Sequence, residues 1–111
     1  MIGYKVVRVD GKNFVSANAG LGTIEYKVNE FVEPIEGNGP LCIFSEVEHA
    51  KSYYKLMNDR DFKIFKAEYK PSRRQYVWYM WNDLSIGDML YFLPYGTVLA
   101  DKVKLIEEVS L

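Results

Sequence analysis

The sequence predicts an α+β domain, in which a mostly antiparallel sheet of about six or seven strands carries one main helix near residues 46–57. Three observations lead to this fold class. Alternating apolar and polar stretches occur on both sides of a single capped helical segment. The strand candidates cluster before and after that helix instead of alternating with helices. The chain has 111 residues, 49% of them hydrophobic and 26% charged, which suits a single domain over residues 1–111.

A hairpin is the first predicted element. Its two strands, residues 4–9 and 12–17, flank Asp10-Gly11. An Asp-Gly pair accepts the positive φ angles of a two-residue hairpin turn. Valine occurs at both alternating sets of positions in the first strand, so we expect that strand to be covered on more than one side.

Two short strand candidates follow the hairpin. Residues 23–28 alternate between apolar and charged side chains, which is typical of a half-buried strand. Residues 41–44 are continuously apolar and include Cys42, the single cysteine of the chain. One cysteine cannot form an internal disulfide, so we expect Cys42 to pack as a small buried hydrophobic side chain.

The strongest helix signal lies directly after this strand. Ser45 is placed to cap the helix, and Glu48, three residues later, completes a capping box. Apolar side chains recur at helical spacing up to Met57 and would form the face that packs on the sheet. His49, the only histidine, falls on the polar side of the helical wheel, so we expect it on the surface.

Further strands are predicted after the helix. Residues 62–70 alternate cleanly, and residues 75–81 are apolar at both alternating sets of positions. Residues 84–90 fit either a strand or a short helix. Residues 97–109 have strong β character, with Asp101-Lys102 as a bulge or break.

Charge is unevenly distributed, although the net charge is −1. Residues 25–48 hold six acidic residues and one lysine, whereas residues 51–74 hold eight basic and three acidic residues. This asymmetry is typical either of a binding face or of two solvated surfaces of opposite sign. The apolar runs are far shorter than the ~20 residues that cross a bilayer, and the N-terminus lacks a signal-peptide core. We therefore expect a soluble, cytoplasmic protein that does not enter a membrane.

Motifs for catalysis, metals and nucleotides are weak. The glycine pairs at residues 20–22 and 37–39 lack the other residues of nucleotide-binding loops. Glu46 and Glu48 would point ~200° apart around a helix and so could not share one ion with His49. We therefore predict no catalytic residue, no metal site and no cofactor, and we favour a protein that is not an enzyme.

A basic and aromatic stretch over residues 63–81 is the most suggestive feature. If it forms a hairpin, cations and flat rings lie close together, which is the chemistry used for single-stranded nucleic acid. The alternatives are an aromatic core beside a solvated lysine face, or a protein-binding surface. The candidate binding residues are Lys66, Lys70, Arg73, Arg74, Tyr76 and Trp78.

Several segments of the chain carry a resemblance to known proteins. They are residues 4–8, residues 39–44 running into the helix, residues 67–70 and residues 94–105. Together they resemble small hypothetical proteins of viral and microbial genomes, and this resemblance implies a structural likeness without a reaction. Arg8 and Ser16 can be matched to the arginine and serine of the Arg-Ser-Glu class, so the chain also resembles ADP-ribosyltransferase-like folds. The Ser-Thr-Ser element of that class is missing.

Three functional hypotheses follow. The leading one is a small non-enzymatic accessory or protein-interaction domain, in which a protein partner or a second copy covers one face of strand 75–81. The first alternative is single-stranded nucleic-acid binding through the basic-aromatic hairpin of residues 63–81. The second alternative, implied by the resemblance, is an ADP-ribosyltransferase-like or other nucleotide-using enzyme.

Overall fold

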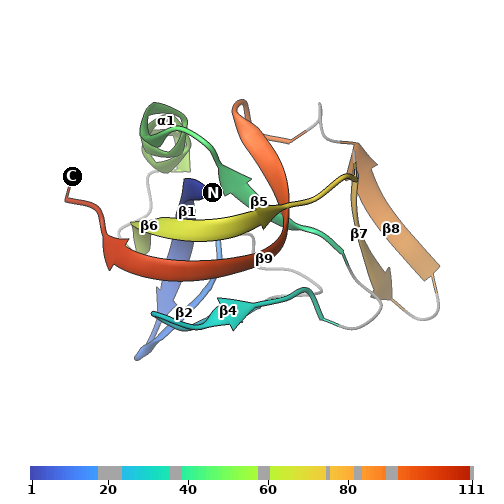
Figure 1. Cartoon of the computed structure of the whole chain (residues 1–111), viewed down its shortest axis with the longest axis horizontal. Coiled ribbons are helices and arrows are strands. Elements are labelled where there is room, and N and C mark those ends of the chain that lie inside the picture. The colour runs from blue at the N-terminus through green and yellow to red at the C-terminus, as the bar shows by residue number, and fades with distance from the viewer. Residues whose placement is uncertain are drawn as a thin grey trace.

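The computed structural model describes most of the chain, and for the strands at residues 76–81 and 84–89 it describes the backbone. The described residues are 1–17, 24–35, 39–57, 61–74, 76–81, 84–89 and 93–110. Figure 1 shows the elements in chain order, which are β1 (Ile2–Asp10), β2 (Asn13–Ser16), β3 (Glu25–Tyr26), β4 (Phe31–Val32), β5 (Leu41–Phe44), α1 (Val47–Met57), β6 (Phe62–Pro71), β7 (Tyr76–Trp81), β8 (Leu84–Met89) and β9 (Thr97–Glu108).

Four of the strands close into a small barrel. β1 pairs with β6, β6 with β9, β9 with β5, and β5 again with β1, all antiparallel. The last of these pairings is made by Tyr4 and Phe44. β2 and β3 extend the sheet beyond β1, and β4 extends it beyond β9, which gives seven strands in the main sheet. The predicted mostly antiparallel α+β fold is confirmed in the described residues, which contain one helix, and the closed core is an addition to it.

The barrel closes because two of its strands change partners along their length. On one edge, β1 pairs first with β5 and then, from Val7 onward, with β2. β9 likewise pairs with β5 up to Ala100 and then with β4. Register shifts against β6 leave Asp101 and Ile106 without a Cα partner there. Such bulges bend a strand, and the first confirms the bulge predicted at Asp101.

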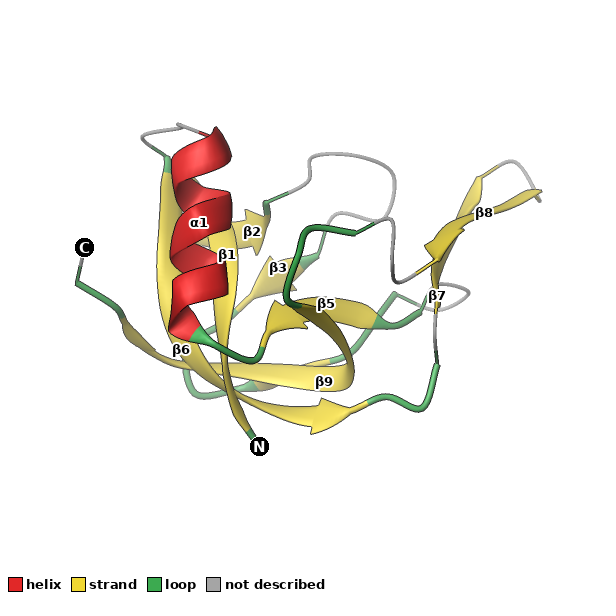
Figure 2. Cartoon of the chain, turned by 90° about the horizontal axis from the view of Figure 1, so that it is seen from above, coloured by secondary structure: helices red, strands yellow, loops and turns green. Residues whose placement is uncertain are grey.

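Apolar side chains fill the barrel and pack beneath the helix. The inner cluster contains Val7, Ile43, Ala67, Val103 and Leu105 among others, each almost completely buried. Valines on both faces of β1 serve both clusters, because Val6 belongs to the second one, under α1. Figure 2 shows α1 lying against β1 and β6 at one end of the molecule.

Close approach of β1 and β5 requires a glycine. A Cβ atom on Gly3 would lie 2.7 Å from the Phe44 carbonyl oxygen and 2.9 Å from the Tyr69 ring. Both distances are too short for real atoms, so a side chain at this position would push the barrel seam apart.

Local predictions in the first half hold with small corrections. The β1–β2 turn is Gly11-Lys12, one residue later than predicted, because Asp10 pairs with Asn13 and Gly11 takes the positive φ of 62°. The helix begins at Val47, and the Ala50 N–H donates to the Glu46 carbonyl at 3.3 Å. Glu46 therefore occupies the N-cap position in place of Ser45.

The expected hairpin over residues 63–81 is wrong. β6 pairs with β1 and β9, whereas β7 pairs with β8 in a separate two-stranded sheet. Residues 84–89 are therefore a strand, not a helix. Figure 1 shows the β7–β8 hairpin at the end of the molecule away from α1. Which face of β7 is covered depends on side chains outside the described part. None of the described helices is long and apolar enough to span a bilayer.

Candidate binding face

The predicted site residues divide between two parts of the fold. Lys66 and Lys70 lie on β6, and Arg73 and Arg74 follow in the turn after it. Tyr76 and Trp78 lie on β7, where they pair with Met89 and Gly87 of β8. The structure thus separates the basic and the aromatic residues at the level of strand pairing, and the side chains of β7 lie outside its description.

Basic residues of β6 meet new basic residues on β9. On β6, Ala67 and Tyr69 are buried in the barrel, so the alternating residues Glu68 and Lys70 lie on the outer face. Lys70 lies directly opposite Lys102, and directly opposite residues share a face of the sheet. Two like charges are therefore neighbours across these strands.

The neighbouring rows of the same strands are neutral. Lys66 lies opposite Glu107. The Lys104 ammonium lies 3.1 Å from the Glu68 carboxylate, with both side chains partly exposed. Positive charge therefore accumulates at one end of the β6–β9 pair, where Lys70 and Lys102 meet.

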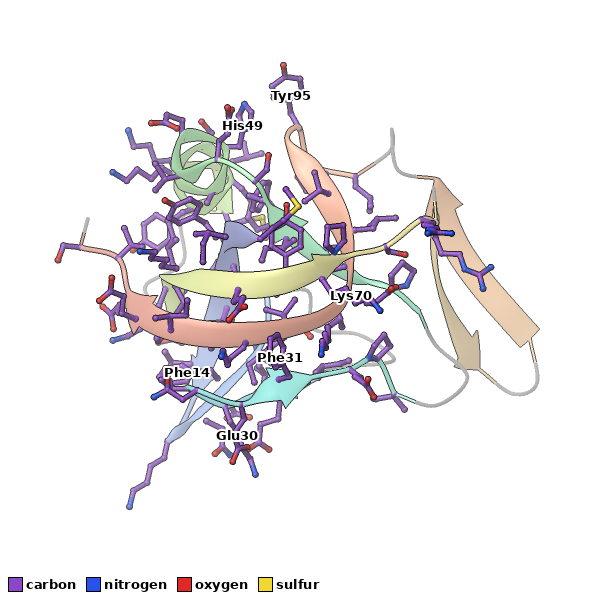
Figure 3. All side chains as sticks on the ribbon, in the orientation of Figure 1. Phe14, Glu30, Phe31, His49, Lys70 and Tyr95 are labelled. Atoms are coloured by element: carbon purple, nitrogen blue, oxygen red, sulfur yellow. The ribbon has the colours of Figure 1, made fainter. Side chains whose placement is uncertain are left out.

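Phe31 completes this end of the face from the edge strand β4. Phe31 lies opposite Lys104, and its ring centroid is 4.3 Å from Nζ of Lys102 and 4.8 Å from Nζ of Lys104. The Phe31 side chain is 42% exposed. Figure 3 shows its ring directed from β4 toward β9, whereas Glu30 points the other way. We call Phe31, Lys70, Lys102 and Lys104 the basic face.

Two further cations follow Lys70 in the turn after β6. Ser72 holds the chain beside β9 after β6 ends, because its N–H donates to the Leu99 carbonyl at 2.9 Å. The Ser72 hydroxyl in turn accepts from the Arg74 N–H at 3.1 Å. Arg73 and Arg74 are exposed in this turn. The turn therefore presents two guanidinium groups close to Lys70 along the chain.

Sequence reasoning missed three members of the basic face. Phe31 lies between the strands predicted at residues 23–28 and 41–44, and Lys102 and Lys104 lie in the strand predicted from the β character of residues 97–109. Their alternation on that strand was the available signal, since Lys-x-Lys places two cations on one face. Their meeting with Phe31 is produced by the β4–β9 pairing.

A second group of polar side chains surrounds a buried lysine. Lys5 is 8% exposed, and its ammonium donates to the Cys42 carbonyl at 2.5 Å and lies 5.1 Å from the centroid of the Tyr26 ring. Burial raises the pKa of the nearby Tyr53 phenol, the Lys5 charge opposes that shift, and Cys42 adds to it. Cys42 is only partly buried, which corrects the small buried side chain expected from its apolar neighbours. The Lys5 amine is held in the barrel wall.

His49 is less exposed than the helical wheel predicts. Its side chain is 26% exposed, and Nδ1 lies 3.4 Å from a carboxylate oxygen of Glu46. The ring packs edge-on against Tyr95, at 4.9 Å between centroids (Figure 3). The turn before β9 covers the residue, which a helical wheel cannot foresee. Among the described residues, no three His, Cys, Asp or Glu side chains are grouped to hold a metal ion.

The residues matched to the transferase class lie on the paired strands β1 and β2. The Ser16 hydroxyl accepts from the Ile24 N–H at 3.0 Å and lies 3.4 Å from its carbonyl oxygen. Arg8 lies opposite Val15, and the preceding residue, Val7, pairs with Ser16. Ser16 thus joins the chain of β2 to the start of β3.

No protein-family model, no curated protein and no solved structure matches the chain. Any functional conclusion must therefore come from the site. Chemically, the basic face offers several ammonium groups and one partly exposed aromatic ring, an arrangement suited to binding an anion.

Proposed function

We propose that the protein is a small non-enzymatic interaction domain, and that it binds an anionic partner through the basic face. The observation that carries the proposal is the placement of Lys70 opposite Lys102, beside the ring of Phe31. A cross-strand pair of like charges destabilises a sheet by a few tenths to about 1 kcal/mol. A bound anion would remove this repulsion.

The surrounding charges support the same conclusion. Glu68 and Asp101 are the carboxylates nearest in the strands, and Glu68 is already paired with Lys104. Lys70, by contrast, is exposed and has another lysine as its neighbour. Arg73 and Arg74 add charge of the same sign in the next turn. Cations grouped in this way raise the local concentration of an anionic ligand and its association rate.

The exposed part of Phe31 also supports a binding role. An aromatic side chain on an edge strand gains more by burial than by remaining 42% exposed. In the free protein its ring is contacted by the ammonium groups of Lys102 and Lys104 through cation–π interactions. A partner that covers the ring would bury apolar area in addition to neutralising charge.

Direct binding of defined anions tests the proposal. We expect oligo(dT), a poly-glutamate peptide, or both to bind at low salt, with affinity that falls as salt rises. Replacement of Lys70 and Lys102 by Gln should weaken the binding. Replacement of Lys12 and Lys55, which are exposed on the hairpin turn and the helix, by Gln is the matched control. Absence of binding by both probes, or equal loss in the control, would overturn the proposal.

A further inference from the structure

We infer that the anionic partner of the basic face is a single-stranded nucleic acid, with a base stacked on Phe31 and phosphates bound by Lys70 and Lys102. This inference rests on the proposed function and narrows it to one class of ligand. The sequence predicted that Tyr76 and Trp78, which lie on the separate β7–β8 sheet, make the aromatic contact. We instead assign this contact to Phe31, on the edge of the main sheet.

Two different chemistries coincide on this face, and one ligand class uses both. Lys70 and Lys102 suit a ligand with closely spaced negative charges, because they lie opposite each other on paired strands. Phe31 suits a flat or apolar group, because this aromatic residue is 42% exposed. Base stacking on aromatic side chains beside a cationic surface is the general means of binding single strands. An acidic peptide would satisfy the lysines and leave the ring without a matching group.

The position of Phe31 favours a single strand over a duplex. The ring belongs to a strand and lies against two lysine ammonium groups at 4.3 and 4.8 Å. A side chain held in this way on the face of a sheet can reach a base only when that base is unstacked from its neighbours. In a duplex the bases are stacked on each other, and only the phosphates would be available.

The carboxylates on β6 and β9 determine the route that a bound nucleic-acid strand would follow over this face. The Glu68 carboxylate forms an ion pair with the Lys104 ammonium at 3.1 Å, and Glu107 lies opposite Lys66. At these two cross-strand pairs the positive charge is neutralised, so a phosphate would gain little by binding there. Asp101 is exposed at the bulge beside Lys102. The favourable path therefore leads from Phe31 across Lys102 and Lys70 toward Arg73 and Arg74, away from the Glu107 end of β9.

Fluorescence anisotropy with three probes separates stacking from charge. The probes are labelled oligo(dT), an abasic phosphodiester oligomer of the same length, and a poly-glutamate peptide. Phe31→Leu should weaken oligo(dT) binding by about 5- to 100-fold, the range expected for loss of one stacked base, and should leave the abasic oligomer unchanged. Phe31→Trp should retain binding of oligo(dT). Tyr95→Leu, at a side chain that is 86% exposed beside the helix, is the matched control and should change nothing.

Lysine variants provide the electrostatic half of the test. Lys70→Gln and Lys102→Gln should weaken oligo(dT) and the abasic oligomer alike, and each should lower the slope of log affinity against log salt by about 0.7. Thermal melting of every variant establishes that the fold is retained. Binding of duplex DNA, as an additional control, should be insensitive to Phe31→Leu, because its bases are stacked on each other and only its phosphates are available.

The outcomes that contradict the inference differ from those that contradict the proposed function. Binding of poly-glutamate without oligo(dT), or equal effects of Phe31→Leu on oligo(dT) and on the abasic oligomer, would overturn the nucleic-acid inference and leave an anion-binding interaction domain. Absence of binding by all three probes would overturn both.

Discussion

The ammonium group of Lys5 donates to the carbonyl oxygen of Cys42 on the adjacent strand. Gly3 and Val7, two residues before and after Lys5 on the same face of β1, are buried in the barrel. This bond lies where β1 leaves β5 and takes β2 as its partner. Lys5 therefore closes the barrel seam with a side chain where the strand ladder ends.

Replacing Lys5 by Met should lower the stability of the fold. Methionine keeps most of the side-chain volume but leaves the Cys42 carbonyl without this donor, which costs about 1–2 kcal/mol. Urea denaturation measures the change, and Lys12→Met, at an exposed turn position, should have almost no effect. A Lys5→Met variant as stable as the parent would mean that the desolvation cost of the ammonium offsets its hydrogen bond.

Stability should fall at alkaline pH because of Tyr53. Burial raises the pKa of its phenol above the ordinary value of 10.0, against the opposing charge of Lys5. The folded state thus holds the phenol proton more tightly than the unfolded state. Its contribution is fully present below about pH 10 and is lost as pH rises through the higher pKa of the folded state.

The variant Tyr53→Phe isolates this contribution. Unfolding free energies of the parent and the variant, measured from about pH 8 to about pH 11, should differ by an amount that changes with pH. The parent should lose stability more steeply than the variant above about pH 10. Parallel curves would show that Tyr53 has the same pKa in both states.

Gly96 should tolerate alanine less well than Gly11 does. Both have positive φ, 85° and 62° respectively, so alanine at either position should cost about 1 kcal/mol of backbone strain. A Cβ on Gly96 would also overlap the ring of His49, whereas one on Gly11 meets open space. Gly96→Ala should therefore cost about 1–3 kcal/mol more than Gly11→Ala.

A double variant identifies the source of the extra loss. His49→Ala removes the ring that the new Cβ would overlap. Gly96→Ala in that background should cost no more than Gly11→Ala, as judged by chemical denaturation. An undiminished cost would place the origin in the turn itself, not in its packing on the helix.

Local patterns in the sequence are sufficient to predict most of the helix and strand positions. They do not predict which strands pair when those strands are far apart in the chain. The Asp10-Gly11 pair, the alternation of residues 62–70 and the apolar spacing of residues 47–57 each act within a few residues, so these elements were predicted. Closure of β1, β6, β9 and β5 depends on contacts between strands far apart in the chain, which leave no short-range signature. The hairpin expected over residues 63–81 is wrong for this reason: β6 pairs with β1 and β9, which are distant in sequence, and not with the next strand, β7.

The candidate site was predictable only in its charge. The excess of basic residues over residues 51–74 led to Lys66, Lys70, Arg73 and Arg74, and their positions on β6 and the following turn follow from alternation and the proline. Lys102 and Phe31 reach Lys70 through the β9 pairings. A protein partner or second copy on β7 remains a prediction, since that strand's side chains lie outside the described structure.

Lys70→Glu should separate stability from binding at the basic face. The new carboxylate would lie opposite Lys102 and replace a like-charge pair by an attractive one. The unfolding free energy should therefore stay the same or rise by about 0.2–1 kcal/mol. Affinity for anionic probes should fall at the same time, because a cation is lost and a carboxylate is introduced on the proposed path. Lys12→Glu, at an exposed turn, controls for net charge and should reduce affinity less. A residue retained only for folding would show the reverse pattern, with lower stability in Lys70→Glu and unchanged binding.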